Sequence, residues 1–208
     1  MKTFNKNINN KRIKTKNKYL INNTKLLENL IKSNSHYGNL LKYSNPKSFN
    51  YLIGLRSKQC IINLESTIQL LKRSFLIIEK VLKKKRKHKV LIICNDIKTS
   101  FLKKELTNKK LLKRIKFINE DWSGGLLTNP LLSKQYLKNI GVIISFNNVH
   151  DNLLIKEANK SNIPLISVAN TNIDPNLINY PIIINDNNIK SIFFLTFLFK
   201  KFFNNLNI

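Results

Sequence analysis

The chain has 208 residues, 42% of them hydrophobic, which suffices for one packed α/β core and excludes a globally disordered protein. Its formal net charge of +26 lies almost entirely in residues 1–116, with 30 Lys or Arg against 5 Asp or Glu, whereas residues 117–208 have 7 against 6. Such a basic half predicts a polyanionic partner, of which RNA and DNA are the usual examples.

Residue usage offers a second explanation for the charge. The chain has 32 Lys but 5 Arg, and only two Ala, which is typical of an A+T-rich gene. Mutational drift in such a gene adds Lys and Asn without any selection for a basic surface. Drift would act on both halves, however, and residues 117–208 are nearly neutral. A functional basic surface is therefore the better interpretation.

The first part of the chain predicts an arm followed by helices and short strands. Residues 1–23 are rich in Lys and Asn and lack the apolar core of a secretory signal, so we expect a basic arm that is disordered away from its partner. Residues 24–208 predict a single α/β domain, whose first portion is 24–88. That portion holds a helix at 24–33, strands at 51–53 and 59–63 around Gly54, and a long helix at 64–84 with Asn63 as its N-cap.

Residues 89–208 predict the core of the domain. Five apolar runs do not alternate with polar residues: 90–96, 115–120, 141–148, 164–172 and 181–186. Helical patterns follow three of these runs. The first is followed by a helix at 99–113, the third by one that ends near 160, and the last by one that begins at 189. Strands buried on both faces indicate a doubly wound parallel sheet with helices on both faces. The final helix is apolar nearly all round, so it either adds to the core or offers a docking surface to a protein partner. No apolar run reaches the roughly 20 residues of a membrane span.

Patterns that would support catalysis or cofactor binding are absent from the sequence. GxGxxG and GxxxxGK[ST] do not occur, Cys60 and Cys94 are solitary, and the three His are scattered. We therefore predict no enzyme activity, cofactor, metal or small-molecule substrate. Each strand ends in Asn or Asp, which favours turns and helix caps, although ligands also bind at this edge of a doubly wound sheet. The pair Gly124-Gly125 follows two acids, so we expect it to shape a loop rather than hold a phosphate.

Two lysine-rich segments are stronger signals. Residues 83–89 carry six positive charges in seven positions at the end of the long helix, and basic pairs recur along 103–116. Helix C-termini attract cations, but fewer would satisfy the helix dipole. Few aromatic residues lie among these charges, so contacts with duplex phosphates are favoured over stacking on unpaired bases.

Several motifs together resemble one family. Residues 119–129, NEDWSGGLLTN, look like the family sequence NxRWLGGMLTN, and Asn170–Pro175 is similar to DTNxDP. The segments His36–Gly38, Tyr43–Lys47, Ile53–Arg56, Ile61–Glu65 and Ile184–Asp186 match further motifs in the same order. On these motifs residues 24–203 resemble ribosomal protein S-two, the universal second protein of the small ribosomal subunit.

The resemblance implies a flavodoxin-like fold and a structural, non-catalytic role with two kinds of partner: small-subunit rRNA and neighbouring ribosomal proteins. It does not imply a homo-oligomer. The residues expected to bind rRNA are Lys11, Arg12, Lys14, Lys16, Lys18, His36, Tyr37, Lys42, Lys47, Arg56, Lys58, Lys83, Lys84, Lys85, Arg86, Lys87, Lys103 and Lys104. The residues expected to hold the structural motifs are Trp122, Gly124, Gly125, Thr128, Asn129, Asp174 and Pro175.

Departures from the family pattern carry further expectations. Only Pro130–Ile140 stand where the family has a long helical hairpin, so that insertion is missing here. Asp121 and Ile184 replace the family's Arg and Gly. The lost insertion and the A+T-rich composition indicate an organelle: we expect a mitochondrial ribosome and an organelle-encoded gene, with the plastid as the alternative. A non-ribosomal nucleic-acid-binding factor and a nucleotide-binding α/β enzyme stay open as other functions.

Overall fold

A computed structural model describes residues 23–84, 88–93, 112–118, 122–131, 137, 139–146 and 152–206. The predicted basic arm lies outside these residues, except for Asn23, which begins a helix. The predicted helix at 99–113 also lies outside them, apart from its last two positions.

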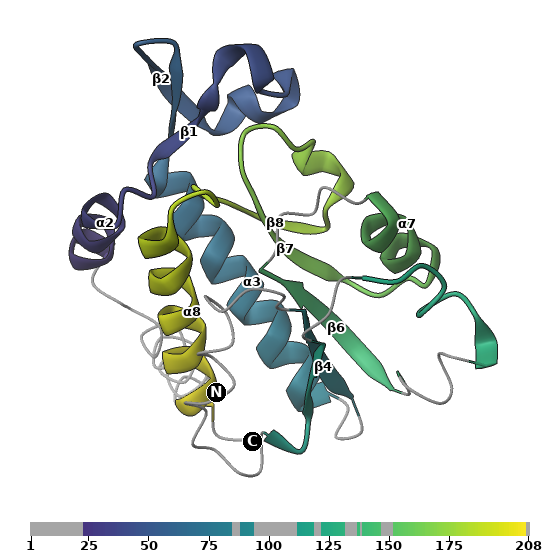
Figure 1. Cartoon of the computed structure of the whole chain (residues 1–208). Helices are drawn as coiled ribbons and strands as arrows, with labels where there is room; N and C mark the ends of the chain where they lie inside the picture. Colours follow the sequence, from purple (N-terminus) through teal and green to yellow (C-terminus); the bar gives the residue numbers. More distant parts are fainter. Residues whose placement is uncertain are drawn as a thin grey trace, which may run out of the picture.

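The centre of the protein is a five-stranded parallel sheet (Figure 1). Its strands in chain order are Lys89–Ile93 (β4), Ile115–Ile118 (β5), Ile140–Ser145 (β6), Leu165–Ala169 (β7) and Tyr180–Ile183 (β8). They lie in the order β5-β4-β6-β7-β8. Counted from β4, this is the order 2-1-3-4-5 of flavodoxin-like sheets, which confirms the predicted fold class.

Apolar residues alternate between two cores, one on each face of the sheet. Val90 and Ile92 point into a core shared with helices Asn23–Lys32 (α2), Leu64–Lys84 (α3) and Ile189–Asn204 (α8). Leu91 and Ile93 point into the opposite core, which is shared with helix Asn152–Lys160 (α7). Burial on both faces explains why the strands read as continuous apolar runs.

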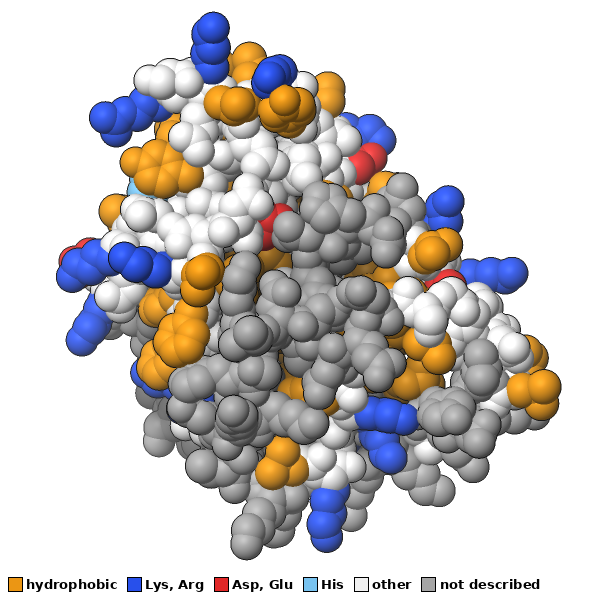
Figure 2. Space-filling model, in the orientation of Figure 1, with side chains coloured by type: hydrophobic (Ala, Val, Ile, Leu, Met, Phe, Trp, Pro, Cys, Tyr) orange, Lys and Arg blue, Asp and Glu red, His pale blue; other side chains and the backbone are white. Residues whose placement is uncertain are grey.

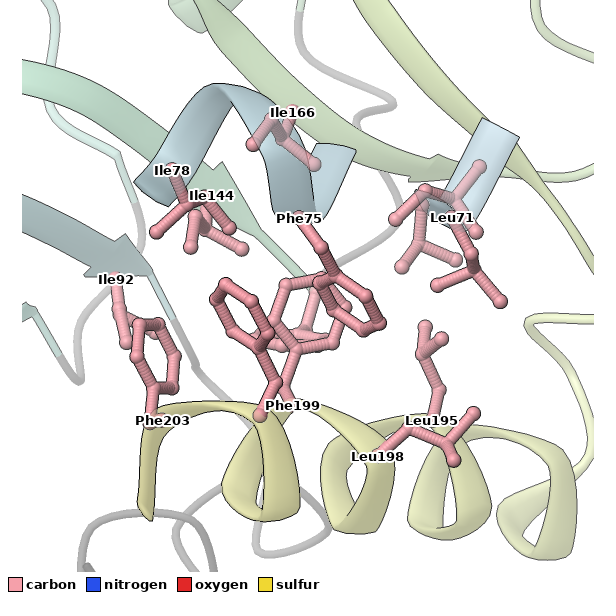
Figure 3. Close-up of a cluster of buried hydrophobic side chains, with 14 of the residues drawn as sticks. Leu71, Phe75, Ile78, Ile92, Ile144, Ile166, Leu195, Leu198, Phe199 and Phe203 are labelled. Atoms are coloured by element: carbon pink, nitrogen blue, oxygen red, sulfur yellow. The ribbon is translucent and has the colours of Figure 1, made fainter. Parts of the chain in front are cut away.

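The final helix belongs largely to the first core, where its side chains meet those of α3 and of the sheet (Figure 3). The Phe75 ring of α3 stacks on Phe202 with centroids 4.4 Å apart and meets the edge of Phe199 at 5.0 Å. Phe197, on the outer face of α8, keeps 43% of its surface exposed. The helix therefore adds mainly to the core, and its outer face remains a predicted docking surface.

A small antiparallel sheet stands at one end of the molecule. It contains Tyr37–Leu40 (β1), Leu52–Arg56 (β2) and Gln59–Ile62 (β3) in the order β1-β3-β2. Two 3-10 helices, Leu41–Tyr43 (η1) and Pro46–Tyr51 (η2), join β1 to β2. The sequence predicted neither β1 nor η2. The strand predicted at 51–53 corresponds to β2, and ending it before Gly54 was wrong, because Gly54 lies within β2.

Long helix α3 follows this sheet as predicted. The Asn63 side chain accepts hydrogen bonds from the backbone N–H of Glu65 and Ser66, at 3.0 and 3.4 Å, which caps the helix N-terminus. Its apolar stripe, including Leu71 and Ile78, is buried. At one residue per 1.5 Å, the 21 residues of α3 span about 30 Å, from the small sheet to the far end of the parallel sheet (Figure 1).

Candidate nucleic-acid interface

The small sheet is anchored to the carboxyl end of β7 by Thr171. The Thr171 hydroxyl accepts hydrogen bonds from the Asn39 N–H and from the Ser44 hydroxyl, both at 3.0 Å. Its carbonyl accepts from the Asn45 N–H at 2.8 Å and from the Ser48 hydroxyl at 2.9 Å. Thr171 is fully buried, so these four bonds fix β1 and the segment that follows it against the parallel sheet.

A second set of contacts joins two of the sequence motifs. Lys47 Nζ lies 2.6 Å from Asp174 Oδ2, and the Asp174 side chain also accepts from the Asn176 N–H at 3.0 Å. The hydrogen bond from Lys47 lowers the pKa of Asp174 below its usual value. Pro175 is buried and begins the 3-10 helix Pro175–Leu177 (η3) that Asp174 caps. Lys47 therefore has an internal partner, although 59% of its side chain is exposed.

The polar residues that follow β7 and β8 also form hydrogen bonds with one another and with the N-terminal segment. Asn170 Nδ2 donates to Asp186 Oδ1 at 2.7 Å and to Asn39 Oδ1 at 3.3 Å. The Asn185 N–H donates to the Ser35 carbonyl at 3.1 Å. Strands predicted to run to 172 and 186 end earlier, at Ala169 and Ile183, because the polar residues leave the ladder to bind the N-terminal segment. At β7 and β8 these side chains therefore anchor the small sheet.

The Gly-Gly loop encloses a carboxylate from the chain itself. Glu157, on α7 and 8% exposed, accepts from the Gly125 N–H at 2.5 Å through Oε1 and from the Leu127 N–H at 3.1 Å through Oε2. Gly125 has a φ of 91°, which favours glycine. The loop shapes the chain locally, as expected, but its backbone N–H groups also hold an anion, the Glu157 carboxylate, a role that the sequence analysis missed.

The rest of this loop is held by packing and by a helix cap. Trp122 is 9% exposed and lies in the α7-side core, and among the described residues no acceptor reaches its indole N–H. Asn129 accepts from the Leu131 N–H at 3.0 Å, whereas Thr128 is exposed. Strand β6 then begins at Ile140, which leaves too short a connection for two packed helices.

Charged candidates gather around the small sheet. Lys42, Arg56 and Lys58 are all exposed, and Figure 2 shows Lys and Arg side chains beside hydrophobic ones at this end of the molecule. Ser57 and Lys58 have φ values of 50° and 65°, the backbone of a two-residue hairpin turn that places Lys58 at the tip. The Lys58 carbonyl accepts from the Leu41 N–H at 2.9 Å, which fixes the hairpin to η1.

His36 and Tyr37 contribute rings rather than charge. Their ring centroids are 4.1 Å apart. Burial, and secondarily the nearby Arg56 guanidinium, lower the pKa of His36, which favours the neutral imidazole. Its Nδ1 is buried without a hydrogen-bond partner among the described residues. The positive potential here therefore comes from the Lys and Arg side chains.

The remaining candidates fall into two groups. Lys83 is exposed and pairs with Glu79 near the end of α3, far from the small sheet. Lys84 ends that helix. The others lie outside the described residues: Lys11, Arg12, Lys14, Lys16, Lys18, Lys85, Arg86, Lys87, Lys103 and Lys104. The structure thus separates the described candidates into one group at the small sheet and another at the end of α3.

Two features of the described residues bear on other functions. No three His, Cys, Asp or Glu side chains in the described ranges are grouped so as to hold a metal ion. Within the same ranges, no helix has the length and apolar character needed to cross a bilayer.

Comparison with known proteins agrees with these motifs. A sequence model of the family described as Ribosomal protein S2 matches residues 30–141 and 133–204. Proteins named small ribosomal subunit protein uS2 from Marinobacter nauticus and Hahella chejuensis are each 28% identical over 210 residues, with 80% of this chain covered and 82% and 81% of theirs. A protein of the same name from Ehrlichia canis is 28% identical over 211 residues, with 81% of this chain and 71% of that protein covered.

Proposed function

The chain belongs to the ribosomal protein S2 family, and from this premise we propose that it is a structural constituent of the small ribosomal subunit that binds rRNA. Its relatives are named as proteins of that subunit. No catalytic role is part of the proposal.

The observation that carries this proposal is the excess of positive charge in the segment that forms the small sheet and its flanks. Residues 29–64 contain no Asp or Glu and five basic residues. Of these, Lys42, Arg56 and Lys58 are exposed around one small structure. Asp174 pairs with Lys47, but the exposed cations still outnumber the neighbouring acids, and such a surface attracts phosphate and repels other cationic surfaces.

The two halves of the chain would then have different neighbours. We propose that residues up to 116, including the basic arm, make most rRNA contacts, and that residues 117–208, which are nearly neutral, face ribosomal proteins or solvent. Proteins that fill the place of the missing hairpin would contact the short connection after Pro130.

A salt titration tests rRNA binding. Affinity of the full chain for transcribed small-subunit rRNA should fall linearly with salt on logarithmic axes, because each neutralised phosphate releases counterions. Replacing Arg56 and Lys58 by Gln should reduce the slope by about 1.5, at roughly 0.7–0.9 per contact.

A matched variant separates local contacts from net charge. Lys156 and Lys160 are exposed on α7, in the neutral half, and changing both to Gln removes the same charge. This control should keep the slope of the unmodified chain. Equal loss of slope in both double variants, or an affinity that salt does not change, would refute a specific role for the hairpin.

We further propose that the ribosome is organellar, mitochondrial rather than plastid. The supporting observations are the Lys-rich, Ala-poor composition and the short connection before β6. The relatives named above are bacterial, so the support for an organelle comes from these two features of the chain and not from the relatives. Antibody detection in purified organelles after protease treatment would test this. Signal in a plastid fraction, or only in cytosolic ribosomes, would contradict the mitochondrial placement.

A further inference from the structure

Glycine is scarce in this chain, and most of its glycines have a structural reason. A Cβ at Gly38 would lie 2.6 Å from Thr171 Cγ2, and one at Gly141 would lie 2.6 Å from both His88 Nδ1 and Val81 Cγ1. Gly125 has a left-handed φ of 91°. Each of these positions excludes a larger residue through a contact or conformation within the chain.

Gly54 has no such reason. It lies in the middle of β2, its φ is outside the left-handed range, and within 4 Å of a built Cβ no heavy atom of the described structure is found. Glycine weakens a strand interior because it has no side chain to pack and loses more backbone entropy on folding. Because neither φ nor packing within the described structure excludes a side chain there, a group outside the chain is the remaining reason for a bare backbone at this position.

The register of the small sheet shows what surrounds Gly54. Gly54 and Tyr37 are both paired with Ile61, so these three residues form a row across one face. The next row on that face contains Leu40, Gln59 and Arg56, because Gln59 is paired with both of the others. On β3, Ile61 and Gln59 are partly exposed, whereas Cys60 and Ile62 on the opposite face are fully buried.

The face that carries Gly54, which we call the outer face, is therefore open to solvent. It has a half-exposed aromatic ring at Tyr37, a bare backbone at Gly54 and a guanidinium at Arg56. Strand β2 is also an edge strand, so its backbone N–H and C=O groups on the side away from β3 make no hydrogen bonds within the small sheet. Backbone N–H groups and Arg side chains are common contacts of nucleic-acid phosphates and sugars.

We propose that an RNA strand packs on this outer face and approaches the backbone at Gly54 to van der Waals distance, with Arg56 on an adjacent phosphate. This deepens the proposed function and rests on it. Charge selects RNA over a protein as the occupant, because the surrounding segment 29–64 is entirely free of acids while Arg56, Lys58 and Lys42 are exposed. Close approach of a ribose or phosphate would explain a glycine that the described fold does not need.

Steric substitution tests this directly. Gly54→Ala and Gly54→Val should weaken the affinity of the full chain for transcribed small-subunit rRNA in that order, with about a tenfold loss for Val, the size of effect expected when a close contact is overpacked. The melting temperature of both variants should equal or exceed that of the unmodified chain, because a Cβ there meets no described atom and Val favours strands. Leu55→Val is the matched control: Leu55 is paired with Cys60, so it points to the other face and should leave rRNA affinity unchanged.

The outcomes separate the two proposals. If the unmodified chain does not bind the rRNA, the proposed function fails and this inference falls with it. If the unmodified chain binds but Gly54→Val binds equally well, the inference alone is overturned. If Gly54→Val binds free rRNA normally but no longer enters the small subunit, the occupant is a protein and the RNA assignment is wrong.

Discussion

Glu157 is the residue whose substitution tests the account of the Gly-Gly loop most sharply. Its carboxylate holds two backbone N–H groups, those of Gly125 and Leu127. We predict that Glu157→Gln, which keeps the size and removes the charge, destabilises the protein and loosens the loop.

The magnitude follows from the two bonds. A Gln side chain offers one oxygen, so one N–H keeps a weaker neutral bond while the other faces an amide donor. An unsatisfied buried donor costs about 1–3 kcal/mol, and a charge-assisted bond is roughly twice as strong as a neutral one. Since a neutral amide is also less costly to bury than a carboxylate, the net loss should be about 2–3 kcal/mol. For a chain of this length that lowers the melting temperature by about 4–12 °C.

Trp122 provides a local readout, because it is the single tryptophan and lies in the same loop. Its fluorescence emission should shift to longer wavelength in Glu157→Gln, at temperatures well below unfolding. Lys156→Gln, at the exposed neighbouring position of α7, should change neither emission nor melting temperature. Unchanged emission together with a melting temperature within about 1 °C of the unmodified chain would refute the cradle as a stabilising contact.

Two further predictions concern the small sheet. Gly38→Ala places a Cβ 2.6 Å from Thr171 Cγ2, so thermal melting should show a loss of about 1–3 kcal/mol, while Gly54→Ala shows none; equal melting of both variants would contradict the packing argument. The pKa of His36 is lowered in the folded state, so its contribution to stability is present above the unfolded value of 6.5. It is lost as pH falls from there through the lower folded pKa, because the unfolded chain binds more protons in that range. Between about pH 7.5 and 5.5 the melting temperature should therefore fall more steeply with decreasing pH for the unmodified chain than for His36→Asn. Equal slopes of melting temperature against pH would count against this.

Sequence patterns predicted the elements that are stabilised locally or by continuous apolar burial. The parallel strands are rich in Ile, Leu and Val, and α3 has both a period of 3.6 residues and a cap at Asn63. These signals lie within a few neighbouring residues, so a single sequence carries them.

What the sequence did not predict depends on distant contacts. Strand β1 has four residues, YGNL, and is held by Thr171, more than 130 positions away in the chain. Glu157 reads as an ordinary helical acid, and its partners lie 30 and 32 positions earlier. The family motifs marked Gly38, Thr171 and the Gly-Gly loop, but only the fold shows which residues bind one another.

The central claim is that this chain is a constituent of the small ribosomal subunit, and sedimentation tests it most directly. Extracts of the source cells should be separated on sucrose gradients and each fraction probed with an antibody against the chain. The account predicts that the protein migrates with the small subunit and its rRNA, and returns to the top of the gradient after RNase treatment. Migration at the top of the gradient without RNase, or with another complex, would contradict it.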